Sequence, residues 1–103
     1  MEIEFLEPEL ERLYLTKKSR KYRLQPQVVT KFFMRIGQIE AADSIFDFWR
    51  TGSLNFERMQ GTEDEFSMRV DLKWRLIIRM RWGDEGRTKG TALILDLSEH
   101  YGG

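Results

Sequence analysis

The hairpin expected at residues 65–82 constrains the fold of this chain more than any other segment, because both of its strands must bury the same face. Apolar residues alternate with polar ones on each side of a short polar turn: Phe66, Met68 and Val70, then Trp74, Leu76, Ile78 and Met80. A three-residue turn at 71–73 places Met68 opposite Leu76 and keeps this face apolar. A two-residue turn would place Arg75 opposite Met68, so the pattern predicts the three-residue turn.

The same register predicts a row of arginines on the opposite face of the hairpin. Arg69 falls directly opposite Arg75, and Arg79 and Arg81 follow along the second strand. Like charges that face each other across two strands are unfavourable unless an anion lies between them. We therefore expect Arg69 and Arg75 to bind an anion, the alternative being that each is an ordinary surface arginine held by a carboxylate of the same hairpin.

The composition points to one folded domain, residues 1–103, without a membrane segment. Hydrophobic residues make up 41% of the chain and charged residues 33%, but no apolar run approaches the roughly 18 residues that span a bilayer. The first residues lack the basic start of a signal peptide, so we expect a cytoplasmic protein. There is no cysteine and only one histidine, which predicts neither a metal centre nor a cofactor.

Hydrophobic periodicity and turn residues predict the order of the elements. A strand at 2–6 is followed by a short helix from Pro8, a charged loop and a long helix from Pro26. A second short helix after Ser44 precedes strands at 54–59, 65–70, 74–82 and 91–97. This order predicts an α+β domain, in which helices pack on one face of a mostly antiparallel sheet and leave the arginine face partly open.

Charge is unevenly distributed although the formal net charge is zero. Residues 1–11 contain glutamates but no base, and residues 12–35 contain bases but no acid. One interpretation is a solvated surface on which the acidic start neutralises the basic loop. The other is a patch that holds phosphates or an acidic partner, for which the candidates are Lys17, Lys18, Arg20, Lys21 and Arg23.

Several short motifs together resemble the RelE/ParE superfamily of toxins, and within it the HigB-like branch. The segments that carry the resemblance are Arg23-Leu24-Gln25-Pro26, Phe56-Glu57-Arg58-Met59-Gln60-Gly61, Phe66-Ser67-Met68-Arg69-Val70, Trp74-Arg75-Leu76-Ile77 and Glu99-His100-Tyr101. Their order and spacing cover nearly the whole chain. The resemblance implies a RelE-like fold and a toxin of a type II toxin-antitoxin pair, bound by a helix-turn-helix antitoxin.

The resemblance further implies an endonuclease that cuts mRNA on the ribosome without a metal and uses the RNA 2′-hydroxyl as nucleophile. Such a reaction needs a base, a cation for the developing charge and an acid for the leaving oxygen. Arg69 and Arg75 match the phosphate-binding arginines of the family. His100 is the natural proton carrier, and Tyr101 would stack on a base or assist as an acid; their alternatives are a surface histidine and an aromatic lid on the sheet.

Two positions depart from the HigB-like pattern. Glu57 stands where the branch has a histidine, and Gln60 stands where it has a lysine. A carboxylate at Glu57 can still act as the base, with Arg79 and Arg81 as further RNA contacts. These departures keep two alternatives open: a RelE-fold protein of little activity that acts by binding an antitoxin, and a ParE-like toxin directed at gyrase. The three tryptophans are expected to pack in the core or at its rim.

Overall fold

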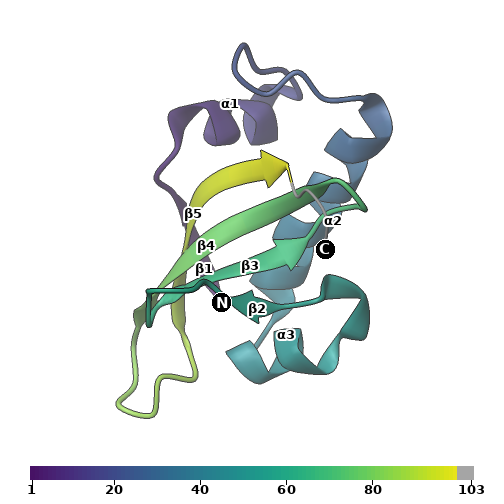
Figure 1. The fold of residues 1–103 in the computed structure, drawn as a ribbon. Helices are drawn as coiled ribbons and strands as arrows, with labels where there is room; N and C mark the ends of the chain where they lie inside the picture. The colour runs from purple at the N-terminus through teal and green to yellow at the C-terminus, as the bar shows by residue number, and fades with distance from the viewer. Residues whose placement is uncertain (100–103) are drawn as a thin grey trace.

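The structure is a computed structural model that describes residues 1–99, and it confirms an α+β fold (Figure 1). Its elements in chain order are β1 (Glu2–Phe5), α1 (Pro8–Thr16), α2 (Pro26–Ala41), α3 (Ile45–Arg50), the 3₁₀ turn η1 (Gly52–Leu54), β2 (Glu57–Arg58), β3 (Glu65–Arg69), β4 (Trp74–Trp82) and β5 (Gly90–Glu99). In Figure 1, α2 runs behind the sheet, α1 lies beside the edge next to β5, and α3 lies beside the edge formed by β2. None of the helices within residues 1–99 is long and apolar enough to cross a membrane.

The five strands form one sheet in the order β1-β5-β4-β3-β2. Only the β1–β5 pair is parallel, and the other pairs are antiparallel. The sheet is therefore mostly antiparallel, as predicted. The β3–β4 hairpin also has the predicted register, with Met68 opposite Leu76 and Arg69 opposite Arg75. Its three-residue turn is closed by Asp71, whose Oδ1 accepts hydrogen bonds from the backbone N–H groups of Lys73 and Trp74 at 2.8 Å each.

One face of the sheet is covered by the helices and forms the core. On α2 the side chains at helical spacing that face the sheet are at most 5% exposed: Val28, Phe32, Ile36 and Ile39. They pack against the predicted apolar face of the hairpin, where the side chains of Phe66, Met68, Leu76 and Ile78 are fully buried. Burial of apolar surface is the main driving force for folding, so this layer fixes which face of the sheet remains open.

The predicted strand at 54–59 is wrong over most of its length. Residues 52–54 form a 3₁₀ turn, Asn55 adopts a left-handed backbone conformation (φ 43°), and β2 has two residues. Leu54 and Phe56 are nevertheless both buried, so their alternation with polar residues was a real burial signal. The short helix before this segment begins as predicted after Ser44, which is its N-cap and forms a capping box with Asp47.

The charged segment between α1 and α2 is a loop, as expected, but it contributes to the core. Tyr22 is only 6% exposed, and its hydroxyl donates a 2.5 Å hydrogen bond to Oδ1 of Asp96 on β5. Leu24 also packs partly against the core. Tyr22 can lie in the core despite the charged residues around it, because a buried tyrosine can satisfy its hydroxyl with a single partner.

Candidate anion-binding site

The open face of the sheet carries a hollow of about 230 Å³ near the end where β4 begins and β5 ends. Its lining comes from four neighbouring strands and the residues next to them: Glu57, Met59, Ser67, Arg75, Ile77, Ser98 and Glu99. Two of these residues, Glu57 and Arg75, are predicted site residues. The sheet thus brings them together although they lie on different strands.

Arg75 forms the floor of this hollow, and its guanidinium is held by the protein itself. The residue is 5% exposed. Its Nε donates to the Ser67 hydroxyl at 2.9 Å, and its Nη2 donates to the backbone carbonyls of Asn55 and Ser67. Removal from water lowers the pKa of Arg75, and the positive charge of Arg69 lowers it further. An arginine stays protonated at any physiological pH, so the hollow has a fixed, rigid cation at its base.

Arg69 lies opposite Arg75 on the open face and differs from it in exposure and in the partners of its guanidinium. Its side chain is partly exposed, and within residues 1–99 its guanidinium has no ion-pair or hydrogen-bond partner. The backbone of Arg69 is anchored, because its carbonyl accepts a 2.6 Å hydrogen bond from Nε of Arg35 on α2. Arg69 is therefore a cation on a fixed backbone with its donors still available.

Glu57 is the one carboxylate near this pair of arginines that forms an ion pair with either of them in the described part of the chain. Its Oε2 lies 4.0 Å from Nη2 of Arg75, and its side chain is 54% exposed. Its negative charge acts on the pKa of Arg75 in the opposite direction to burial. A separation of 4.0 Å is too long for a hydrogen bond, so the carboxylate remains able to accept a proton from a ligand in the hollow.

Arg79 and Arg81, the other arginines predicted on this face, form ion pairs with glutamates of two other strands. Arg79 donates through Nε and Nη2 to Glu65 on β3, with a closest distance of 2.9 Å. Arg81 forms an ion pair with Glu4 on β1, also at 2.9 Å. Of the four arginines predicted as one surface, Arg69 is thus the one whose guanidinium has no partner within residues 1–99.

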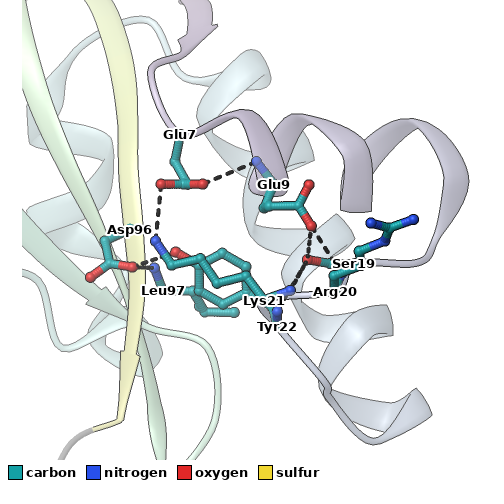
Figure 2. A network of polar contacts seen from close by, with 8 residues as sticks. All are labelled: Glu7, Glu9, Ser19, Arg20, Lys21, Tyr22, Asp96 and Leu97. Carbon is teal, nitrogen blue, oxygen red and sulfur yellow. Dashed lines mark hydrogen bonds and ion pairs between the residues drawn. The ribbon is translucent and has the colours of Figure 1, made fainter.

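The basic loop is partly occupied in the same way, as Figure 2 shows. Lys21 forms an ion pair with Glu7 at 3.1 Å, and Glu9 accepts hydrogen bonds from the backbone N–H of Arg20 and the hydroxyl of Ser19. These hydrogen bonds lower the pKa of Glu9, and a backbone N–H bond together with Lys21 lowers that of Glu7. Four side chains of the loop keep exposed cations without a carboxylate partner in residues 1–99: Lys17, Lys18, Arg20 and Arg23.

His100 and Tyr101 lie outside the described residues, and Glu99 directly before them lines the hollow. Three residues that position the site were not predicted: Arg35, Asn55 and Ser67. The alternation of the hairpin places Ser67 on the arginine face, so its position could have been found from the sequence. The hydrogen bonds of Arg35 and Asn55 depend on long-range packing and carry no local signal.

No protein-family model matches the sequence, and no curated protein matches it significantly. What the site can do chemically therefore follows from its geometry. The buried guanidinium of Arg75 and the carboxylate of Glu57 line a polar hollow on the open sheet face. The available guanidinium belongs to Arg69, which pairs with Arg75 across the two strands but is not part of the lining of the hollow. Guanidinium groups bind phosphate oxygens through charge-assisted hydrogen bonds, and a carboxylate can take a proton from a hydroxyl held beside such a phosphate.

Proposed function

We propose that the chain is the toxin of a type II toxin-antitoxin pair and cleaves mRNA on the ribosome, with the scissile phosphate bound by Arg69 and Arg75. The observation that carries the proposal is the pair of facing arginines, of which Arg69 has no carboxylate partner within residues 1–99. Glu57 pairs with Arg75 at 4.0 Å and leaves the charge of Arg69 without a carboxylate partner in the described residues. Two facing cations with one acid between them favour an additional anionic ligand. An RNA phosphate fits both this chemistry and the motifs in the sequence.

In the proposed reaction, the 2′-hydroxyl of the RNA attacks the adjacent phosphorus and the 5′-oxygen of the next nucleotide leaves. Glu57 is placed to take the proton from the hydroxyl, because it borders the hollow and has an exposed carboxylate. Arg69 and Arg75 stabilise the charge that develops on the phosphate oxygens. His100, supported by Tyr101, is the proposed source of the proton for the leaving oxygen.

The proposal also assigns the remaining exposed bases to partners. The side chains of Lys17, Lys18, Arg20 and Arg23 are available for phosphates of ribosomal RNA, which would position the toxin without reading sequence. The expected inhibitor is a helix-turn-helix antitoxin encoded in an adjacent reading frame. Both the ribosome and this inhibitor place the protein in the cytoplasm.

The direct test is cleavage of mRNA on purified ribosomes. Ribosomes programmed with a defined mRNA are incubated with the wild-type protein, and cleavage is mapped by primer extension. We expect cuts that depend on the ribosome and that disappear with Arg69→Ala, whereas the matched variant Arg81→Ala retains them because Arg81 is already paired with Glu4. Intact mRNA with the wild-type protein would contradict the enzymatic function.

A second function is favoured by one observation, namely that Arg75 uses Nε and Nη2 on acceptors within the protein. A site built in this way could hold a partner without performing the reaction. The chain would then be a RelE-fold protein that binds its antitoxin and has little activity, consistent with glutamine at position 60. Tight complex formation with the adjacent gene product, combined with uncut mRNA in the ribosome assay, would select this function over the first.

A further inference from the structure

A second hollow, of about 320 Å³, lies at the same end of the sheet but between other elements. It is bordered by the residues before α2, the first turn of α2, the β3–β4 turn and the last residue of β5. Glu99 lines both this hollow and the one above Arg75. Trp74 and Arg75 are consecutive on β4, so their side chains lie on opposite faces of the sheet. A ligand held at Arg75 therefore reaches the second hollow by passing over the end of the sheet.

The second hollow has an aromatic wall and an apolar floor. Trp74 is half-buried and packs against the core with one side, while it lines the hollow with another part of its surface. Leu24 and Val28 provide the apolar lining opposite. The indole N–H of Trp74 has no hydrogen-bond partner in residues 1–99. An amphipathic aromatic surface of this kind is a platform on which a nucleobase can stack.

The rim of the second hollow adds charge that suits the backbone of a nucleotide. Arg23 and Lys73 are exposed, border the hollow, and have no carboxylate partner within residues 1–99. Two carboxylates line the hollow as well, those of Glu99 and Asp71. Oδ1 of Asp71 accepts hydrogen bonds from the backbone N–H groups that close the β3–β4 turn. These bonds fix the backbone on which Lys73 and Trp74 stand, so the wall of the hollow is preorganised.

We propose that this hollow is a nucleoside subsite, in which a base of the RNA stacks on Trp74 and the adjoining phosphate contacts Arg23 and Lys73. The subsite rests on the proposed function, because it takes a nucleotide neighbouring the one whose phosphate lies at Arg69 and Arg75. Stacking on an aromatic side chain tolerates any base. The subsite would thus add affinity and fix the path of the strand.

The test is binding of a short single-stranded oligonucleotide that cannot be cleaved because every 2′-hydroxyl is replaced by hydrogen. A fluorescein label allows the dissociation constant to be measured by anisotropy. Trp74→Leu is expected to weaken binding at least about fivefold, since loss of a stacked base costs on the order of 1–3 kcal/mol. Trp49→Leu is the matched control, because Trp49 is 46% exposed on α3 and lines neither hollow.

Oligonucleotides that lack one base test whether stacking is responsible. Removing the base that lies on Trp74 should weaken binding to the wild-type protein by the same factor, and Trp74→Leu should then have no additional effect. Removing other bases should leave the effect of Trp74→Leu intact. If Trp74→Leu weakens binding equally for every oligonucleotide, including all of those with a missing base, the subsite is overturned.

A second pair of substitutions keeps the proposal testable if Trp74→Leu unfolds. Arg23→Ala combined with Lys73→Ala changes two exposed side chains that contact one phosphate, and it should reduce the slope of log affinity against log salt by about 0.7. An unchanged slope would overturn the subsite. If Arg69→Ala weakens binding but neither the Trp74 nor the Arg23/Lys73 variant does, the subsite is wrong and the phosphate site stands. If the wild-type protein binds no oligonucleotide, both proposals fail.

Discussion

The two halves of β4 carry the same residue type on the same face of the sheet, but with different cross-strand neighbours. In the second half, Arg79 faces Glu65 on β3, and Arg81 reaches Glu4 on β1. In the first half, Arg75 faces Arg69 on one side and Ser98 on the other. The number of arginines on a face therefore does not locate a site. The positions of the carboxylates on the other strands decide which arginines remain available for a ligand.

The arginines of the two halves of β4 also differ in how far their side chains are buried. The side chains of Arg79 and Arg81 are 47% and 59% exposed, whereas that of Arg75 is 6% exposed. Exposed ion pairs contribute little to stability because solvent screens them and because ordering two long side chains costs entropy. A buried guanidinium with several hydrogen bonds is different, because removing it leaves buried acceptors without a donor. The following substitutions test this comparison, from the largest expected effect to the smallest.

Replacing Arg75 should have the largest effect. Arg75→Met leaves the Ser67 hydroxyl and the carbonyls of Ser67 and Asn55 without their donor. We expect the free energy of unfolding to fall by about 2–4 kcal/mol, measured by urea denaturation. Arg79→Met is the control on the same strand and should cost less than about 1 kcal/mol. Equal losses for the two variants would show that the two halves of β4 do not differ.

Replacing Arg69 should affect ligand binding and leave the fold intact. Its guanidinium has no partner within residues 1–99, so Arg69→Ala should change the urea midpoint little. Loss of a charge-assisted contact to phosphate should weaken binding of an oligonucleotide by roughly 10- to 150-fold, equivalent to about 1.5–3 kcal/mol. Arg81→Ala removes the same charge from the same face but from an ion pair, and it should weaken binding far less. A weaker-binding Arg81→Ala would place the RNA on the other half of β4.

Asp96 is on β5 and pairs with Ile77, the residue of β4 between Arg75 and Arg79. The Tyr22 hydroxyl donates a hydrogen bond to the carboxylate of Asp96. Tyr22→Phe removes this hydrogen bond and should lower the free energy of unfolding by about 1 kcal/mol. Burial, followed by the hydrogen bond to Asp96, raises the pKa of Tyr22 above its ordinary value of 10.0. The stabilisation is therefore complete below pH 10 and is lost as the pH rises from there towards the raised pKa.

Thermal melts between pH 8 and pH 11, a range of about one to two units around the ordinary tyrosine pKa, test this assignment. The wild-type protein should lose stability above about pH 10 more steeply than Tyr22→Phe. Tyr14→Phe serves as the matched control, because the Tyr14 hydroxyl makes only an exposed 3.4 Å hydrogen bond to Glu40. A wild-type curve that parallels that of Tyr22→Phe would mean that the hydroxyl does not stabilise the folded state.

The smallest effect is expected at the Arg81–Glu4 ion pair. Both side chains are about half exposed, at 59% and 49%. Glu4→Gln should change the free energy of unfolding by less than about 1 kcal/mol. The change should shrink further in 1 M salt, where the screening length is about 3 Å. A loss of several kcal/mol that persists in high salt would make this half of β4 as important for folding as Arg75.

The alternation of apolar and polar residues was sufficient to predict the hairpin, in which one face is buried and the other is open. The alternation on both sides of 71–73 gave the hairpin register and the Arg69–Arg75 pairing, because a one-residue slip would turn every apolar side chain outwards. The same rule failed at 54–59. There Leu54 and Phe56 are both buried, but the left-handed Asn55 between them turns the chain, and alternation of buried residues does not distinguish a turn from a strand.

The sequence by itself determined the α+β class, the covered face of the sheet and the row of arginines on its open face. It did so because side-chain direction along a strand follows a period of two. Only the tertiary structure decided which arginines are available. Glu4 reaches Arg81 across 77 residues of sequence, and Asn55 binds Arg75 across 20. Those contacts depend on the strand order β1-β5-β4-β3-β2, which no short stretch of sequence specifies.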